Sequence, residues 1–229
     1  SITVVTVNAM NSEVYGNVSK TGSGGGIYFA GNTLTLSGVG TDTTQTTTVY
    51  EPDGSIRSQT STTLADTSDI LIVSNTATAG DGGAVYIQEN TSADTTLRII
   101  LTNAYVYGNH ADKGRGGAFF LTPNDTFYFV ATNTTVTGNS ALNGGAFYFA
   151  SEISEKATLV LPTLLSYNYA EQNGGAIYAV GNLKWSSAVT FTGNTAKGKG
   201  GALYVEGNLE ISGSRSEERR VGKECRSRW

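Results

Sequence analysis

The sequence has little of what catalytic and metal sites most often use. Its 229 residues include one Cys, one His and three Pro, and 15% are charged, against roughly 25% in an average soluble domain. A single cysteine excludes an intrachain disulfide and a Cys-ligated zinc site. No apolar run approaches the ~18 residues of a membrane helix, and no basic segment followed by an apolar one marks a signal peptide. Lys, Arg and Glu are scarce while Gly, Ser, Thr and Asn are abundant, which argues against an all-α fold.

The last residues, 215–229, differ in composition from everything before them. They read RSEERRVGKECRSRW and resemble the in-frame translation of a common short-read sequencing adapter. We therefore treat 1–214 as the native part and 215–229 as a non-native, adapter-derived tail. The tail holds six of the 15 basic residues, three of the 19 acidic residues and the one Cys, which leaves nine basic and 16 acidic residues and a net charge of −7. That balance argues against a nucleic-acid-binding surface.

The rest of the sequence is built of repeats. Six times, the pattern Φ-x-x-N (Φ, apolar) is followed by a short polar stretch, then by Gly-Gly-Ala or Gly-Gly-Gly, an apolar residue and an aromatic residue. The asparagines of the six copies are Asn17, Asn75, Asn109, Asn139, Asn168 and Asn194. They lie 58, 34, 30, 29 and 26 residues apart. Because 58 is about two repeats, we expect the Thr-rich stretch 38–67 to replace or decorate one unit.

A third apolar segment lies between successive copies, so each repeat offers three short strands separated by turn residues. These segments are 33–37, 96–101, 126–131, 157–162, 182–186 and 208–212. Three strands in a period of about 25–35 residues predict an all-β fold, a parallel β-helix in which each strand pairs with its counterpart one coil above and below.

Alternation along the strand after Gly-Gly predicts which side chains are buried. One apolar column is expected inside, at Ile27, Val85, Phe119, Phe147, Ile177 and Leu203, with a second two residues on, at Phe29, Ile87, Leu121, Phe149, Ala179 and Val205. The aromatic column between them is expected to face outward and to stack, because coils lie ~4.8 Å apart. We take it as a candidate contact ladder: Tyr28, Tyr86, Phe120, Tyr148, Tyr178 and Tyr204.

The Asn and Gly columns have a structural interpretation. Asn tolerates a left-handed backbone at a strand end, and stacked Asn side chains can bond to one another coil by coil. The glycines enter tight corners; those of the column are Gly25, Gly83, Gly117, Gly145, Gly175 and Gly201. We assign no residue a catalytic, cofactor-binding or metal-binding role.

The paired motifs resemble the FxxN and GGA(I/L/V) repeats of the chlamydial polymorphic membrane proteins. FTGN at 191–194 and GGAI at 174–177 are strict copies, and the resemblance covers roughly residues 14–205. It implies a right-handed parallel β-helix, exported to the cell surface (the outer membrane in a bacterium) as an adhesin-like autotransporter passenger. It also implies host-cell or neighbouring-cell glycans or proteins as partners, no nucleic acid, and membrane contact only through an anchor or barrel outside this sequence.

A carbohydrate-active enzyme is the main alternative, because polysaccharide lyases and hydrolases also use the parallel β-helix. Hydrolysis needs two carboxylates about 5–10 Å apart. Asp81 and Asp112 fall at the same turn of two copies and are expected to face one another when stacked. Around Asp112 lies the one cluster of residue types suited to acid–base or lyase chemistry: His110, Asp112, Lys113 and Arg115. We interpret this cluster as a solvated polar turn and predict no catalysis.

Two further features leave alternatives open. Thr-x-Thr columns on a solenoid can order water, so ice binding is a minor alternative, although only 135–137 and 190–192 show the pattern before Asn. The insertion at 39–69 carries a hairpin-like turn, EPDGS at 51–55, between Thr-rich arms. It is either a contact loop or a solvated decoration.

The adapter interpretation makes a prediction about the gene. We expect the genomic locus to diverge from this sequence at about Ser214, because an adapter is ligated to the insert and is not encoded by the organism. Sequencing across the locus checks this, and a genome that encodes RSEERRVGKECRSRW in frame would contradict it.

Overall fold

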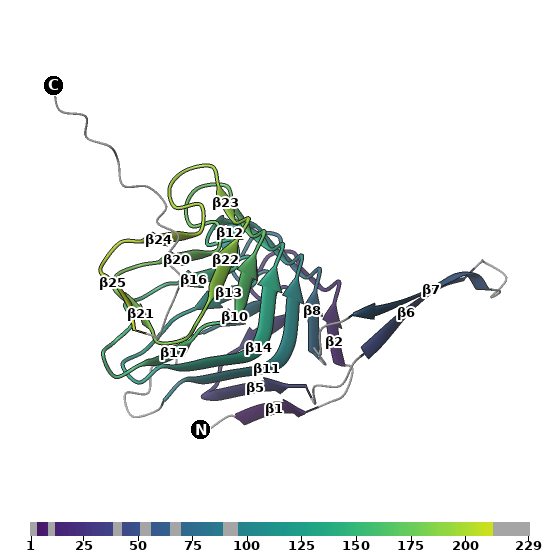
Figure 1. The fold of residues 1–229 in the computed structure, drawn as a ribbon, viewed down its shortest axis with the longest axis horizontal. Helices are drawn as coiled ribbons and strands as arrows, with labels where there is room; N and C mark the ends of the chain where they lie inside the picture. Colours follow the sequence, from purple (N-terminus) through teal and green to yellow (C-terminus); the bar gives the residue numbers. More distant parts are fainter. Residues whose placement is uncertain are drawn as a thin grey trace.

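The computed structural model describes residues 4–8, 12–38, 43–50, 56–64, 70–88 and 96–212, with side chains described in 12–38, 70–88 and 96–212. Within these residues the chain is all-β, with 25 strands and no helix. The strands stack side by side in parallel sheets that form the walls of a β-solenoid (Figure 1). The predicted parallel β-helix is thereby confirmed. The tail 215–229 and the turn 51–55 lie outside the described residues.

Two six-stranded walls contain one strand from each of the six repeats. The wall that follows Gly-Gly consists of β4 (Ile27–Phe29), β10 (Val85–Ile87), β13 (Phe119–Leu121), β16 (Phe147–Phe149), β20 (Ile177–Ala179) and β24 (Leu203–Val205). The wall that follows Asn consists of β3 (Val18–Ser19), β9 (Thr76–Ala77), β12 (His110–Arg115), β15 (Ser140–Asn143), β19 (Tyr169–Ala170) and β23 (Thr195–Ala196).

The third wall contains the strands that precede Asn and most of the third apolar segments. Its strands are β1 (Val4–Asn8), β2 (Ser12–Tyr15), β5 (Thr33–Ser37), β8 (Ile70–Val73), β11 (Arg98–Tyr107), β14 (Tyr128–Thr137), β17 (Thr158–Val160), β18 (Leu164–Ser166) and β22 (Thr190–Thr192). Two remaining third segments pair with each other as β21 (Leu183–Trp185) and β25 (Leu209–Ile211).

In two coils the third apolar segment is not a separate strand, contrary to the prediction of three short strands in every coil. In β11 and β14 the third segment runs on into the strand before Asn. The chain bends within each strand at Asn103 and Asn133, whose φ angles are 50° and 46°. Their side chains also bond to each other, Nδ2 of Asn133 donating to Oδ1 of Asn103 at 2.9 Å. A left-handed asparagine therefore turns the corner while strand pairing continues on both sides.

The insertion near 39–69 decorates a single coil and does not replace one. Ser12 pairs directly with Ile70, and Ile27 pairs directly with Val85, so the coils on either side of the 58-residue spacing are adjacent. The interval between β5 and β8 contains an antiparallel hairpin, β6 (Thr43–Tyr50) and β7 (Ile56–Leu64). Of the two alternatives that the 58-residue spacing left open, the pairing supports decoration of one unit, because a long insertion at a corner leaves strand pairing intact.

The inner columns are buried as the alternation predicts. Val85, Phe119, Phe147 and Ile177 are fully buried, whereas Ile27 and Leu203 in the two outermost coils are only partly buried. The rings of Phe119 and Phe147 stack with centroids 4.9 Å apart, and Phe129 from the facing wall meets both edge-on. The core is thus closed by aromatic contacts between walls as well as along the stack.

Truncation of the central core ring is expected to be costly. Phe147→Ala removes a fully buried ring, and a deletion of that size typically costs about 3–5 kcal/mol. Urea unfolding followed by circular dichroism measures the loss, with Tyr167→Ala, an exposed tyrosine, as the control. A loss for Phe147→Ala no larger than that for Tyr167→Ala would contradict the assigned core.

Candidate binding surfaces

The motif asparagines form one continuous hydrogen-bonded ladder. Each of the first five donates from its backbone N–H and from Nδ2 to Oδ1 of the asparagine in the next coil, at 2.9–3.1 Å. Nδ2 also donates to a carbonyl of the preceding coil, as Asn109 does to Ile72 at 2.8 Å. Asn75, Asn109, Asn139 and Asn168 are fully buried. One amide group therefore links the coil below to the coil above.

The left-handed residue of this turn is the one before Asn. The φ angle is positive at Gly16, Ser74, Gly108, Gly138, Tyr167 and Gly193, each directly preceding a ladder asparagine. None of the six asparagines has a positive φ. The expectation that Asn itself adopts the left-handed backbone was wrong. The residue before it takes that conformation, and in four of the six copies it is a glycine, which does so at no steric cost.

The two glycines of each Gly-Gly corner have different structural roles. The first has a left-handed backbone, with φ of 64–70° in the six copies. The second is required by the next coil: a Cβ on Gly25 would lie 2.2 Å from the carbonyl oxygen of Gly83. Gly83, Gly117, Gly145 and Gly175 meet the same obstacle, whereas the nearest described atom to a Cβ on Gly201 lies at 3.4 Å. The second glycine thus permits the close approach of stacked backbones.

The aromatic column stacks along its whole length, with centroids of successive rings 4.9–5.3 Å apart. Its expected outward exposure holds only in part. Tyr28 at the end of the stack is 55% exposed, but Phe120 and Tyr148 are only 4% and 7% exposed. The structure corrects the prediction for these two rings, which are covered by their neighbours and by the Arg115 side chain.

Arg115 lies over the centre of this stack. Its guanidinium carbon is 4.9 Å from the Phe120 ring centre and 4.8 Å from that of Tyr148. Asp81 of the preceding coil binds it through both carboxylate oxygens, at 3.1 and 2.8 Å. The hydrogen bond to Asp81 raises the pKa of Arg115 above its ordinary value, and the two-point contact with Asp81 holds the cation over the rings.

The chemistry-capable cluster at this corner does not converge. His110 Nδ1 lies 2.6 Å from Ser140 Oγ, and Asp112 and Lys113 are exposed. Ala111 pairs with Ala77 of the coil below, and Asp112 follows directly after this pair. The residue that meets Asp81 is Arg115, three residues further along the chain. The expectation that Asp81 and Asp112 face one another was therefore wrong, because the register brings Arg115 beside Asp81.

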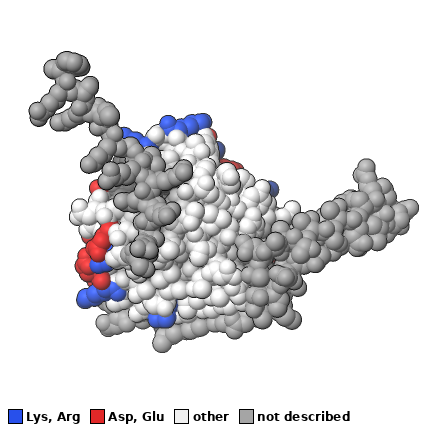
Figure 2. All heavy atoms as spheres, in the orientation of Figure 1, with Lys and Arg blue, Asp and Glu red and all other residues white. Residues whose placement is uncertain are grey.

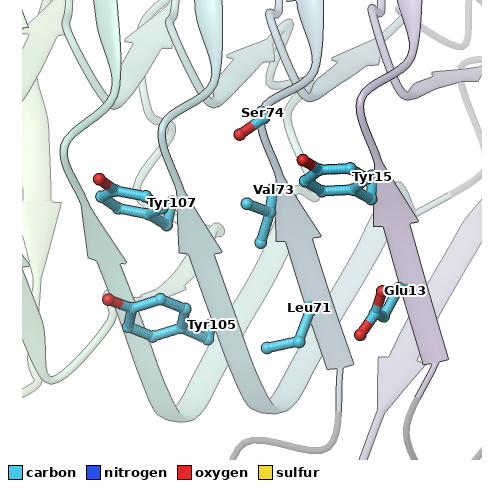
Figure 3. A pocket seen from close by; sticks show the side chains of 7 residues that line it. All are labelled: Glu13, Tyr15, Leu71, Val73, Ser74, Tyr105 and Tyr107. Atoms are coloured by element: carbon cyan, nitrogen blue, oxygen red, sulfur yellow. The ribbon is translucent and has the colours of Figure 1, made fainter. Parts of the chain in front are cut away.

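The outward face of the third wall has a groove that the sequence reading missed. Its lining comes from three adjacent strands, β2, β8 and β11: Glu13, Tyr15, Leu71, Val73, Ser74, Tyr105 and Tyr107 (Figure 3). The signal lies in the strand register, which sets the aliphatic Leu71 and Val73 between the polar and aromatic side chains of β2 and β11. It cannot be read from the sequence, because the 58-residue spacing does not show that β2 and β8 are adjacent.

The Thr-x-Thr pairs of the same face do not form an array. Thr135 pairs with Leu164, which pairs with Thr190, and Thr137 pairs with Ser166, which pairs with Thr192. Leu164 therefore interrupts one of the two columns that a regular threonine surface would need.

Among the described residues, no group of three or more His, Cys, Asp or Glu side chains could hold a metal ion. In the same part of the chain, no helix is long and apolar enough to cross a membrane.

The ladder makes a prediction about stability. Asn139→Asp replaces an NH₂ group that donates to Thr137 O and Asn168 Oδ1 with an oxygen that repels both, so we expect a loss of about 2–4 kcal/mol at neutral pH. The pKa of the new buried carboxyl is raised in the folded state, so the loss shrinks as the pH falls toward about 4. Urea unfolding across this pH range measures it.

The control is Asn143→Asp, because that side chain lies at the surface and its Oδ1 still accepts from Asn173 N. If Asn139→Asp is no more harmful than Asn143→Asp, the ladder does not carry the stability assigned to it.

Comparison with known families matches the ladder region to one of them. The model of the Chlamydia polymorphic membrane protein repeat matches residues 162–180 and 188–206. Searches of curated proteins and of solved structures gave no match. The two matched segments contain the fifth and sixth Asn and Gly-Gly motifs, with Asn168 and Asn194 in the ladder. The chain thus carries consecutive repeats of the chlamydial polymorphic membrane protein type, stacked as coils of a parallel β-solenoid.

Proposed function

We propose that this chain is a surface-exposed β-solenoid that acts as an adhesin-like binding or scaffolding module without catalysis. The observation that carries the proposal is the match of two stacked coils to the Chlamydia polymorphic membrane protein repeat. A membrane-protein repeat of this type supports an extracellular or cell-surface location, the outer membrane in a bacterium. Export as an autotransporter passenger belongs to the same proposal.

The use of the repeat residues also supports a non-catalytic role. The asparagines and glycines of the motifs hold the coils together and are not available to a substrate. The acid–base types at the 110–115 corner are bound to structural partners or point separately into solvent. General acid–base catalysis needs groups that converge on one reacting bond, and this corner offers no such convergence.

The contact surface belongs to the outward positions, which the fold leaves free to vary. In the aromatic column Tyr28 at the stack end is the ring most open to a partner, since Phe120 and Tyr148 are covered. The groove on the third wall adds a second aromatic surface, with Tyr15 and Tyr107 exposed. Exposed tyrosines combine apolar area with a hydroxyl and suit recognition of glycans or proteins.

The proposal predicts accessibility and adhesion. We expect an epitope-tagged chain expressed in its native organism to be cleaved by protease added to intact cells. Beads coated with the purified protein should adhere to host or neighbouring cells, and beads coated with the Asn139→Asp variant, as a destabilised control, should adhere less. Protection from protease on intact cells that disappears on lysis would contradict surface exposure.

A second measurement tests the absence of catalysis. Incubation with a panel of polysaccharides is expected to release no product. Depolymerisation that Asp112→Asn abolishes would show an enzyme and overturn the non-catalytic part of the proposal.

A further inference from the structure

The groove on the third wall arises from a step in side-chain size. In register along the stack, Glu13, Leu71 and Tyr105 form one row, and Tyr15, Val73 and Tyr107 form the next. The middle strand thus presents two aliphatic side chains between a strand that ends in Tyr15 and a strand with two tyrosines. Figure 3 shows Leu71 and Val73 between these neighbours, with Ser74 at one end. The hollow is an open groove of about 410 Å³, within the roughly 300–1,000 Å³ typical of ligand sites.

The chemistry of the lining is amphipathic. Leu71 and Val73 are partly exposed and form an apolar floor. Tyr15 is 66% exposed and Tyr107 46% exposed, so their rings offer apolar faces and hydroxyl groups to a ligand. Tyr105 stacks against Tyr107 with ring centroids 6.1 Å apart, which supports that side of the groove. The Glu13 carboxylate and the Ser74 hydroxyl stand at the rim and supply hydrogen-bonding groups.

The face around the groove carries almost no charge. Arg98 lies on the part of β11 before the bend at Asn103, over the ring of Tyr128. In the segments that directly precede the ladder asparagines, the outward positions of β2, β8, β11, β14, β18 and β22 are Glu13, Tyr15, Leu71, Val73, Tyr105, Tyr107, Thr135, Thr137, Leu164, Ser166, Thr190 and Thr192. Glu13 is the one charged residue in that set, and the set contains no cation. Figure 2 shows the same wall, over β11 and β14, as a largely uncharged surface. An acidic ligand would find no counter-charge in these rows.

From these features we infer that the groove binds a neutral saccharide. A pyranose ring has an apolar C–H face that suits Leu71, Val73 and the tyrosine rings, and hydroxyl groups that suit the carboxylate and hydroxyls of the rim. Two strand spacings, about 9–10 Å, separate the backbones that bear Tyr15 and Tyr107, which leaves width for one sugar ring above Val73 between these two strands. β8, which forms the floor, is paired with β2 on one side and with β11 on the other, so the floor is held in place before binding.

This inference deepens the proposed binding role by naming its ligand class and its site. The two are separable by experiment, because saccharide binding is measured on the purified chain without cells. Adhesion that survives loss of the groove would leave the proposed function standing and would place its contacts elsewhere.

The test uses the full chain, labelled with ¹⁵N and followed by NMR. The probes are lactose, N,N′-diacetylchitobiose and mannobiose as neutral disaccharides, 3′-sialyllactose as an acidic one, and tetralysine as a cationic peptide. We expect at least one neutral disaccharide at millimolar concentration to shift the amide signals of 71–74 and 105–107. Tyr15→Ala is expected to weaken that binding roughly tenfold.

Two further variants separate the groove from the fold. Val73→Tyr fills the hollow with a residue suited to a strand and should abolish binding while circular dichroism is unchanged. Tyr167→Ala is the matched control, because Tyr167 is 69% exposed and does not line the groove, and its binding should equal that of the original chain. The inference is overturned if no neutral disaccharide shifts the groove signals. Tighter binding of sialyllactose or tetralysine than of every neutral probe, or unchanged binding by Val73→Tyr, would overturn it as well.

Discussion

The buried asparagine ladder is the interaction on which the rest of this structure depends. A solenoid coil is too short to bury its own core, so it is stable only when the coils above and below hold it in register. At each inner level one asparagine amide accepts from the coil below, donates back to a carbonyl of that coil and donates to the coil above, as Asn109 does. Because these amides are fully buried, breaking one level would leave several unpaired polar groups in the interior.

The ladder fixes the height of each coil, and the other regularities follow from that height. The carbonyl of the next coil then lies where a Cβ would stand on the second glycine, so that position excludes every other residue. Rings at equivalent positions meet at stacking distance, both in the core and in the aromatic column. The positions that face solvent on the third wall have no such constraint, and they differ from coil to coil, from Glu13 and Leu71 to Tyr105 and Thr135. We expect the binding of a partner to use these positions.

Sequence reasoning succeeded where a local pattern has one structural solution. Alternation along GGA-Φ-Y placed Phe119, Phe147 and Ile177 in the core, and the repeat of Asn placed the ladder at a strand end. It failed where the answer depends on the neighbouring coil. Nothing local in the sequence shows that Arg115, held by Asp81 of the coil below, covers Phe120 and Tyr148.

The sequence predicted the insertion but left open whether it replaces or decorates a unit, and it gave no sign of the groove. A corner can absorb 39–69 without adding a coil, since Ser12 still pairs with Ile70. Spacing alone does not distinguish this from a degenerate repeat. The groove depends on that pairing, because only direct contact between β2 and β8 sets Val73 beside Tyr15. The long strand at 98–107 likewise required knowledge that Asn103 bends the chain without ending the sheet.

Native-state hydrogen exchange tests the role of the ladder most directly. The backbone N–H groups of Asn75, Asn109 and Asn139 each donate to the Oδ1 of the next asparagine inside the core. The account predicts that they exchange only when the coils separate, as slowly as the core amide of Phe147. Exchange of these amides as fast as that of an exposed turn amide such as Lys20 would contradict the claim that the ladder holds the stack together.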